Sequence, residues 1–594
     1  MSNSSVLQAA IAALSGNPEQ LSAVNERGHC VVLAGPGSGK TKTLTTAIAR
    51  SLAEDIAAPR GIACITYSNE CSLELENRLV SLGVETHGHV FVGTVHGFAL
   101  AHVIVPYARC TVPELRNGVA VATRAQCRAA VEAAHARTIG GGEDPHRRWR
   151  FAEEKRRSQV DRSKPEWRER NPELMDFIEA YEAELRSLGV IDFDDMPLLA
   201  FRLIQAHPWI GQALAAKFPA LFVDEYQDLG HALHALVLEL CFKHGVRLFA
   251  VGDADQSIYA FTGANPELLR SLTERTDVAT VRLRLNYRCG TTIISASMAA
   301  LGEDRGYVAS DDTHAGEVVF YGSDGGLADQ ANAIVANVLP AILARGIPLH
   351  EIAILYRTAA QGAAVSNAAV SAGYPVVRAD NQALVRRNSR VARFVEGCAQ
   401  WVSGGWKLAV PRFQKLVSDA VAIVHGHAFS DGDRQAITAE LAEFLKPASM
   451  TGISLNQWLI EFRRDVLEPW RRRATTAGED FSAVDEMIER TDVTGPDHDL
   501  SVAHFGGHIQ GSGRLNLSTL HSAKGREFDA VILFAMNNDV LPEQRDTRNA
   551  GSLREARRLF YVGVTRPRKL LYACYRNKGN SPWVRELYDR INAP

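Results

Sequence analysis

The sequence predicts a multidomain α/β protein built on parallel sheets. Its 594 residues are enough for about four units of roughly 150 residues each. Short apolar runs alternate with helical stretches, which is the pattern that parallel sheets produce. The sequence GPGSGKT at residues 35–41 fits the pattern G-x-x-x-x-G-K-[ST]. It stands between an apolar run and a helical stretch, as a phosphate-binding loop does.

This loop indicates a nucleoside triphosphate as the ligand. Glycines let backbone N–H groups turn inward around the phosphates, and the following helix adds its positive dipole end. Lys40 would reach the β- and γ-phosphates, and the Thr41 hydroxyl would coordinate Mg²⁺. The alternative is a glycine-rich turn without a ligand, and the flanking strand and helix favour nucleotide binding over it. The candidate loop residues are Gly35, Pro36, Gly37, Ser38, Gly39, Lys40, Thr41 and Lys42.

The composition is that of a soluble globular protein, with 46% apolar and 22% charged residues. No apolar run approaches the ~18 residues of a membrane span, and the N-terminus has no basic flank typical of a signal peptide. Nine cysteines without a C-x-x-C pair indicate a reduced, cytoplasmic protein without a zinc or iron–sulfur site. Because the net charge is −3, any nucleic-acid binding must come from local patches.

Several polar residues on both sides of the loop are candidates for ligand contacts. A helix start at residues 17–24 carries Gln20, whose amide could pair with an adenine edge, although a surface glutamine is the plainer alternative. Residues 61–69 and 90–98 each predict a strand that leads into a helix. Parallel sheets bind ligands at such strand ends, but loop caps and a core histidine explain the residues equally well. The candidates at these ends are Tyr67, Asn69, Thr94 and His96.

Residues 99–185 have a helical pattern and contain a basic segment. It extends from Arg147 to Arg170 and includes Trp149 and Trp167. Basic residues with interleaved aromatics suit the backbone of a nucleic acid. A solvated helix face explains them equally well.

A second strong signal is the apolar strand at residues 220–223, which ends in Asp224 and Glu225. One carboxylate would hold Mg²⁺, and the next would orient or deprotonate an attacking water. A further strand at residues 248–252 leads into a polar loop. There Gln256 could sense a γ-phosphate, and Tyr259 and Phe261 offer faces for base stacking.

The second half of the chain repeats the alternation of strands and helices. Arg288 closes a strand and suits a phosphate contact from another domain. Residues 396–510 are mostly helical and include two histidine pairs, His425/His427 and His504/His508, which we interpret as structural because no metal-ligand partners flank them. Strands are predicted at residues 317–321, 352–357, 376–378, 515–521 and 530–534, and a helix at 555–563.

The order of these motifs resembles that of superfamily 1 DNA helicases of the UvrD/Rep/PcrA type, over essentially the whole chain. The resemblance implies two RecA-like parallel-sheet domains with two inserted helical subdomains. We expect the first domain at residues 1–98 and 186–280 with an insertion at 99–185, and the second at 281–395 and 511–594 with a shortened insertion at 396–510. The matching motifs are NPEQ at 17–20, the loop at 35–41, DEYQD at 224–228, the segment 252–259, NYR at 286–288, HSAKGREF at 521–528 and RRLFYVGVTR at 557–566.

The resemblance implies a role for each residue that matches a family motif in the nucleotide site. Gln20 would bind adenine, Tyr287 would stack on it, and Glu527 would contact the nucleotide. Lys40, Thr41 and Asp224 would hold ATP with Mg²⁺, and Glu225 would be the catalytic base.

The resemblance also implies transition-state contacts and a track for single-stranded DNA. Gln256 would contact the γ-phosphate, while Arg288 and Arg566 would stabilise transition-state charge from the second domain. The DNA track would consist of Tyr67, Asn69, Thr94, His96, Tyr259, Phe261, Thr519 and His521.

The sequence departs from the family pattern at several positions. Glu70 replaces the family's lysine, Phe261-Thr262 replaces Trp-Arg, and Pro567 replaces the usual alanine. The second insertion is short, at about 110 residues by its predicted limits. The strand-splitting hairpin is reduced to residues 576–580, RNKGN, which carry no aromatic residue. We expect these changes to preserve ATP hydrolysis and to weaken autonomous unwinding of duplex DNA.

The sequence therefore favours an ATP-dependent translocase or helicase that moves 3′ to 5′ on single-stranded or 3′-tailed DNA, in DNA repair or antiviral defence. The alternative is a DNA-stimulated ATPase that senses DNA and regulates a separately encoded nuclease, because helicase subunits of Gabija-type phage-defence systems resemble this chain in their trimmed insertions. A metabolic phosphate-loop kinase does not explain the second, arginine-bearing half.

Overall fold

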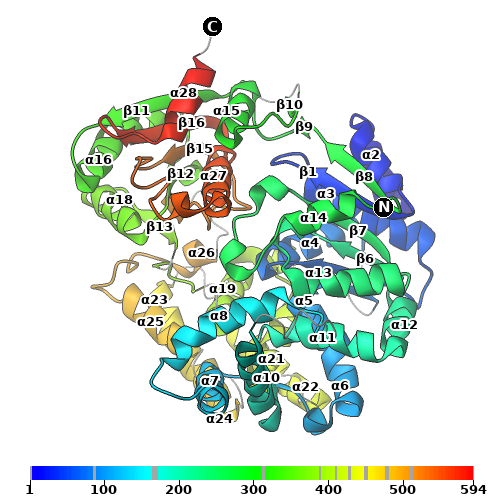
Figure 1. The fold of residues 1–594 in the computed structure, drawn as a ribbon. Helices are drawn as coiled ribbons and strands as arrows, with labels where there is room; N and C mark the ends of the chain where they lie inside the picture. Colours follow the sequence, from blue (N-terminus) through cyan, green and yellow to red (C-terminus); the bar gives the residue numbers. More distant parts are fainter. Residues whose placement is uncertain are drawn as a thin grey trace. The chain divides into compact units, whose positions relative to one another are not determined.

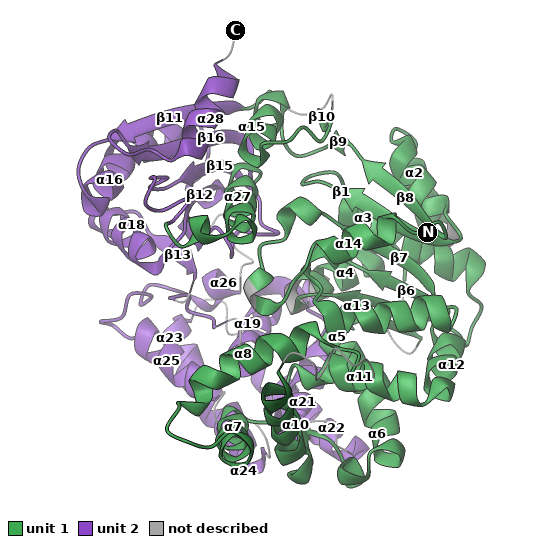
Figure 2. Ribbon diagram, viewed as in Figure 1, with its two compact units in different colours: residues 1–316, 544–565 green, residues 317–543, 566–594 purple. Residues whose placement is uncertain are grey.

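The structure divides into two compact units. It is a computed structural model that describes residues 3–84, 89–162, 171–310, 315–380, 382–386, 389–408, 411–425, 430–446, 453–474, 481–506 and 513–592. Unit 1 comprises residues 1–316 and 544–565, and unit 2 comprises residues 317–543 and 566–594 (Figure 2). Among the described residues, no helix is both long enough and apolar enough to cross a membrane.

Unit 1 is built on a six-stranded parallel sheet with the order β3-β2-β6-β7-β1-β8 (Figure 1). Its strands are nearly continuous apolar runs, as expected of a sheet that is covered on both faces. Successive residues of β1 point to opposite faces, so Val31 lies in one core and Cys30 and Val32 in the other. The strands are β1 His29–Ala34, β2 Ile62–Thr66, β3 Val90–Thr94, β6 Ala220–Val223, β7 Arg247–Gly252 and β8 Val278–Leu283.

Helices on the two faces of this sheet form the two cores. Leu44 and Leu75 belong to the core that contains Cys30, and Leu199 and Leu236 belong to the core that contains Val31. The helices that carry these residues are α3 Lys40–Arg50, α4 Asn69–Ser81, α11 Asp195–Ala206 and α13 His231–Leu238.

The predicted helical insertion of unit 1 contains α7 Arg124–Thr138, α8 Pro145–Ser158 and α10 Pro172–Ser187. A buried ionic network joins it to the start of α11. The fully buried guanidinium of Arg156 on α8 lies 2.9 Å from Glu182, 2.7 Å from Asp192 and 2.9 Å from Asp195. The nearby Arg156 charge holds the pKa of the Asp192 carboxyl below its usual value, despite the opposing effect of burial.

The segments 281–316 and 544–565 group with unit 1, whereas the sequence prediction placed them in the second RecA-like domain. Strand β9 Leu285–Asn286 pairs with β10 Val308–Ala309, and helix α27 Ala550–Val564 packs on α15 Thr291–Leu301. Arg557 of α27 donates hydrogen bonds to the carbonyls of Ala299 and Ala300 at the end of α15. These contacts join the two segments to each other, and hydrogen bonds from Asn286 and Tyr287 to the carbonyls of Pro36 and Gly37 join them to the rest of unit 1.

Unit 2 contains a second six-stranded parallel sheet, with the order β11-β16-β15-β12-β14-β13. Two parallel sheets in one chain confirm the predicted fold class. The strands are β11 Glu317–Ser323, β12 Ile352–Tyr356, β13 Val376–Ala379, β14 Leu515–Thr519, β15 Phe528–Leu533 and β16 Pro567–Arg576. The helices beside them include α16 Leu327–Ala333 and α18 Ala359–Ser371, and α28 Pro582–Ile591, whose Tyr588 ring contacts Phe320 of β11.

The helical part of unit 2 has its own core, in which Trp458 and Trp470 are fully buried. Of the predicted structural histidines, His504 bonds through Nδ1 to the Ser501 hydroxyl at 2.9 Å, while His427 and His508 lie outside the described residues. The helices include α19 Arg390–Gln400, α21 Phe413–His425, α22 Asp431–Phe444, α23 Leu455–Phe462, α25 Ser482–Thr491 and α26 Val502–Phe505.

We expect Arg156→Ala to lower the free energy of unfolding by about 3–5 kcal/mol, because it leaves buried carboxylates without their shared cation. Urea unfolding of the full chain, followed by tryptophan fluorescence, measures this loss. The control is Arg78→Ala, which breaks an exposed pair with Glu74 at 2.7 Å and should change stability by less than about 1 kcal/mol. Equal effects of the two substitutions would contradict the importance of the buried network.

Candidate nucleotide and nucleic-acid site

The phosphate loop joins β1 to α3 at the carboxyl edge of the sheet of unit 1. Gly37 and Gly39 have φ values of 70° and 82°, in the left-handed region that side chains disfavour. The Ser38 hydroxyl donates to the carbonyl of Gly35 at 2.7 Å and braces the turn. Helix α3 begins at Lys40, so its N-terminus faces the space that the loop encloses.

Other segments of unit 1 pack so closely against the loop that a side chain at its glycine positions would collide with them. The Asn286 amide donates to the carbonyl of Pro36 at 2.9 Å, and the backbone N–H of Tyr287 donates to the carbonyl of Gly37 at 2.8 Å. A Cβ atom on Gly37 would lie 2.6 Å from the Arg288 Cβ. One on Gly35 would lie 2.4 Å from the ring of Tyr307.

The predicted adenine-binding residues meet beside this loop. Gln20, on helix α2 Pro18–Asn25, is buried, and its amide donates to the carbonyl of Ser38 at 3.1 Å. The Tyr287 hydroxyl lies 3.5 Å from the Gln20 side-chain oxygen and accepts a hydrogen bond from Asn17 at 3.1 Å. Tyr287 is 45% exposed, so its ring offers a free face. Asn17, the N-cap of α2, matched the NPEQ motif but was given no role by the sequence prediction.

The paired carboxylates Asp224 and Glu225 follow β6. Glu225 has a φ of 50°, an unusual value for a residue with a side chain. Its carboxylate forms an ion pair with Lys40 at 3.7 Å. Burial, and then the neighbouring Glu225 charge, raise the pKa of Asp224 to about 7. A buried carboxylate with so little compensating charge gains from a cation, and this donor set fits a hard divalent ion.

A hydrogen-bonded chain links Glu225 to the loop that carries Gln256. Gln227 donates to the Glu225 carboxylate and accepts from the backbone N–H of Asp253 at 2.9 Å. Asp253 in turn accepts from the Gln256 amide at 2.6 Å. The sequence prediction identified Glu225 and Gln256. It gave no role to Gln227 or Asp253, which stand within the matched motifs.

Three of the predicted track residues in unit 1, namely Tyr67, His96 and Tyr259, take part in stacked ring pairs. Tyr67 and Tyr259 stack with ring centroids 5.5 Å apart. His96 stacks on Phe193 at 3.8 Å, and Phe193 is 59% exposed. Thr94 caps the short helix after β3 by accepting from the N–H of Gly97 at 3.1 Å. The side chains of Asn69 and Phe261 lie outside the described residues.

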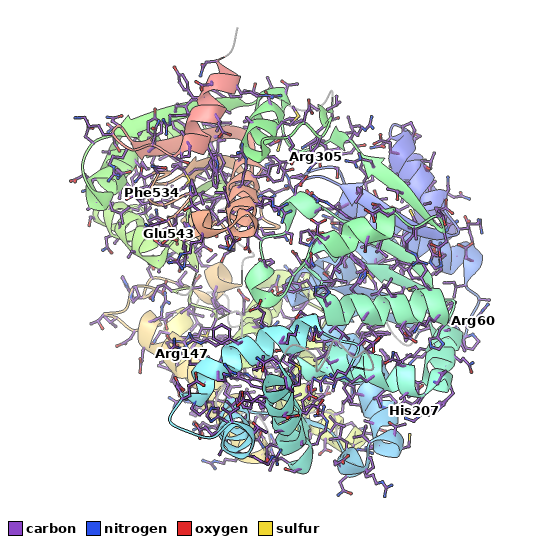
Figure 3. The ribbon with its side chains drawn as sticks, viewed as in Figure 1. Arg60, Arg147, His207, Arg305, Phe534 and Glu543 are labelled. Carbon is purple, nitrogen blue, oxygen red and sulfur yellow. The ribbon has the colours of Figure 1, made fainter. Side chains whose placement is uncertain are left out.

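Phe193 was missed because it belongs to an acidic turn, and only the fold brings it to His96. Trp149, in contrast, is a structural residue. Its ring packs against Tyr181 at 4.1 Å inside the insertion, and Trp167 lies outside the described residues. The exposed side of α8 carries Arg147, which Figure 3 labels, together with Arg150.

The predicted site residues of unit 2 lie at the ends of strands β14, β15 and β16 or in the segments next to them. Thr519 ends β14 and its hydroxyl donates to that of Ser522 at 2.9 Å. Glu527 lies 3.4 Å from Arg568, and His521 lies between β14 and β15. Arg566 is buried and donates to the carbonyl of Arg526 at 3.3 Å.

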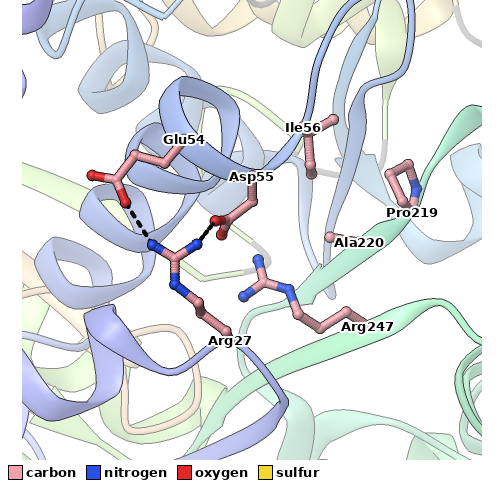
Figure 4. Close-up of a pocket in the computed structure, with 7 residues that line it drawn as sticks. All are labelled: Arg27, Glu54, Asp55, Ile56, Pro219, Ala220 and Arg247. Carbon is pink, nitrogen blue, oxygen red and sulfur yellow. Dashed lines mark hydrogen bonds and ion pairs between the residues drawn. The ribbon is translucent and has the colours of Figure 1, made fainter.

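A cavity of about 460 Å³ lies at the opposite, amino-terminal end of the first sheet (Figure 4). Arg27 on its rim pairs with Asp55 and, at 3.1 Å, with Glu54, while Arg247 donates to the Ser51 hydroxyl at 2.6 Å. Its charges are compensated from within the protein. We therefore interpret this cavity as structural.

The phosphate loop, the buried carboxylates and the adenine-side residues define a phosphate-loop nucleotide-binding protein with two parallel sheets. Residues 16–277 match the family model of the UvrD/REP helicase N-terminal domain, and residues 502–578 match that of the UvrD-like helicase C-terminal domain. The chain belongs to the UvrD/Rep/PcrA-like helicase family.

Three relatives illustrate this membership. The chain is 25% identical to ATP-dependent DNA helicase PcrA of Leuconostoc citreum, over 97% of the chain and 83% of the relative. It is 27% identical to ATP-dependent DNA helicase UvrD1 of Mycobacterium tuberculosis strain H37Rv, over 94% and 81%. It is 25% identical to DNA helicase II of Escherichia coli K12, over 92% and 82%.

The stacked His96 gives a pH-dependent prediction. Burial lowers the pKa of His96 from 6.5 to about 4, so the unfolded chain binds a proton that the folded chain rejects between these values. His96 therefore costs stability as the pH falls through this window. His96→Phe keeps a ring against Phe193 and removes the proton site.

We expect the melting temperature of the wild type to fall relative to that of His96→Phe between about pH 7.5 and about pH 5. Differential scanning fluorimetry of the full chain measures the difference. The control is His89→Phe, because His89 is exposed and should give no such relative change. A constant difference between wild type and His96→Phe across this range would contradict the neutral, buried imidazole.

Proposed function

We propose that this chain is an ATP-dependent DNA helicase that hydrolyses ATP in unit 1 and moves 3′ to 5′ along single-stranded DNA. The observation that carries the proposal is the convergence of Gln20, Tyr287 and the Lys40–Glu225 pair on one phosphate loop. The names of the relatives, which describe ATP-dependent DNA helicases, support the same activity.

ATP binding would rearrange the Lys40–Glu225 ion pair. The phosphates compete for Lys40, and once Lys40 pairs with them Glu225 is released to act as a base. Glu225 then takes a proton from a water whose oxygen attacks the γ-phosphorus, and ADP leaves. Gln227 holds the Glu225 carboxylate in place for this step. Thr41 and Asp224 would hold Mg²⁺, which neutralises phosphate charge when bound.

The remaining nucleotide contacts are proposed from the family motifs. Gln256 would contact the γ-phosphate from the position that Asp253 gives its amide. Arg288 and Arg566 would stabilise the charge of the transition state. Tyr287 would stack on adenine, and Glu527 would contact the nucleotide.

The DNA track would use aromatic stacking for the bases. Tyr67, Tyr259 and His96 offer ring faces, and Phe193 extends this set. Because the low pKa keeps His96 neutral at physiological pH, it would contact bases and would not neutralise phosphates. Asn69, Thr94, Phe261, Thr519 and His521 complete the proposed track.

Substitutions of Lys40 and Glu225 should affect different steps, nucleotide binding for Lys40 and hydrolysis for Glu225. Lys40→Ala should weaken nucleotide binding, because a positive charge on the phosphates is lost. Glu225→Gln should bind ATP and lose roughly 10²–10⁴-fold in turnover, the usual effect of losing a general base. Phosphate release and fluorescent-nucleotide titrations separate the two effects.

Matched controls are Arg78→Ala and Glu267→Gln, which alter exposed ion pairs in the same unit. Normal hydrolysis by Glu225→Gln would overturn the assignment of the base.

The short loop at residues 576–580, which stands in place of the strand-splitting hairpin, is hydrogen-bonded to residues 537 and 538 of the same unit. The backbone N–H of Arg576 donates to Asn537 at 2.8 Å, and the carbonyl of Gly579 accepts from the N–H of Asn538 at 2.8 Å. Trp583, the next aromatic residue, is only 5% exposed. This loop therefore presents no ring that could stack on the first base pair of a duplex.

We expect the purified chain to hydrolyse ATP with single-stranded DNA and to translocate, but to unwind a 3′-tailed duplex of about twenty base pairs poorly. Each base-pair step costs only about 1.4 kcal/mol, so the limit is coupling rather than energy. Strand-displacement and translocation assays on the same preparation measure both. Fast, processive unwinding by the chain alone would contradict this expectation.

The same reduced loop favours a second candidate function, in which the chain is a DNA-stimulated ATPase that regulates a separately encoded nuclease. In that case DNA would stimulate hydrolysis, and neither unwinding nor sustained translocation would occur without the partner. Adding the product of a neighbouring nuclease gene to the assays distinguishes the two candidates.

A further inference from the structure

We propose that Arg305 is a positioning residue that couples the γ-phosphate-sensing loop to the segment that carries Arg288. This inference rests on the proposed function, since it concerns the same ATP site. Arg305 lies on residues 304–310, which we call the strap. Figure 3 labels Arg305 beside β9 and β10. The sequence prediction gave no role to any strap residue.

One end of the strap is anchored to the sensing loop by a bidentate ion pair. The Arg305 Nε and Nη2 atoms donate to the two carboxylate oxygens of Asp255, at 2.7 and 2.9 Å. The Asp255 side chain is 9% exposed and that of Arg305 is 23% exposed. Two parallel bonds to a largely buried carboxylate fix orientation as well as distance.

Asp255 stands one residue before Gln256 and belongs to the same turn. Its backbone N–H donates to Asp253 at 3.0 Å, and the other oxygen of Asp253 accepts from Gln256 at 2.6 Å. A movement of Asp255 would therefore displace the group that orients the Gln256 amide.

The other end of the strap is joined to the strand before Arg288. The N–H of Val308 donates to the carbonyl of Arg284 at 3.0 Å, and that of Ser310 donates to the carbonyl of Asn286 at 2.8 Å. The Asn286 side chain then accepts from the N–H of Arg288 at 2.8 Å. Between the two ends, the Tyr307 ring occupies the space that a side chain on Gly35 would need.

The strap thus contacts three groups that the proposed function assigns to the γ-phosphate site: the phosphate loop, the Gln256 turn and the Arg288 strand. Loss of Arg305 would leave Asp255 beside Asp253, and like charges at this distance repel. Arg558 of α27 also acts on Asp255 electrostatically, so some positive charge would remain. The bidentate geometry of Arg305 on Asp255 is therefore the feature to test.

The first measurement is the preference for a γ-phosphate, given by the ratio of the affinities for ATPγS and ADP. We expect Arg305→Ala to reduce this ratio about tenfold while ADP affinity stays within about twofold, because the phosphate loop itself is unchanged. Arg305→Lys keeps the charge and loses the fork, so it should fall between wild type and Arg305→Ala. Thermal melting confirms that each variant is folded.

The second measurement is the coupling between the two partners. Asp255→Asn should cause a similar loss, and the double variant should be no worse than either single variant, because both act through one interaction. The control is Arg270→Ala, which breaks an exposed pair with Glu267 at 2.9 Å in the same unit and should leave the ratio unchanged.

An unchanged ATPγS-to-ADP ratio in a folded Arg305→Ala, or additive losses in the double variant, would overturn the inference. Both readouts are binding measurements, so they decide it even if the chain does not hydrolyse ATP. Absence of DNA-stimulated hydrolysis in the wild type would instead overturn the proposed function.

Discussion

The site depends on one constraint, which is that the phosphate loop must present backbone N–H groups with nothing in front of them. Each of its three glycines is also approached from another part of unit 1. Tyr307 lies over Gly35, Asn286 and Arg288 over Gly37, and Gln20 over Gly39. Gly37 and Gly39 permit the left-handed backbone of the loop, and all three glycines leave room for the side chains that pack against it. A side chain at any of the three would push out a residue that the site needs.

Two buried charged clusters in unit 1 differ in how far their charges are balanced by neighbouring groups. Around Arg156, the carboxylates of Glu182, Asp192 and Asp195 are compensated by Arg156 together with Arg162, Arg186 and Arg202, and these ion pairs hold separate helices together. Around Asp224 and Glu225, Lys40 faces the two carboxylates, and burial together with the Glu225 charge raises the pKa of Asp224 to about 7. Burying more negative charge than the neighbouring cation balances costs stability, and a bound cation would remove that cost. The contrast supports a structural role for the Arg156 cluster and the proposed ligand role of Asp224.

The sequence predicted both sheets and could indicate a candidate ATP site because these features are local. Buried parallel strands are continuous apolar runs, and the phosphate loop and Asp224-Glu225 are short motifs at strand ends. The missed features are contacts between distant segments. Phe193 meets His96 across about a hundred residues of sequence, and Arg305 meets Asp255 across fifty, so neither pair has a sequence signature. Trp149 illustrates the reverse case, in which a suggestive local pattern is used for packing.

The loop between β5, which spans Val190–Ile191, and α11 connects the insertion to the proposed DNA track. Asp192 and Asp195 are held by Arg156, and Asp194 accepts from Arg157 at 2.8 Å, while Phe193 between them points its ring to His96. Three of four consecutive side chains are thus fixed by arginines of α8, and the fourth stacks on the track. Because α8 belongs to the insertion, a displacement of the insertion would be transmitted to Phe193 without any change in the sheet. If the proposed track binds bases, the insertion would then set the position of one of its stacking rings.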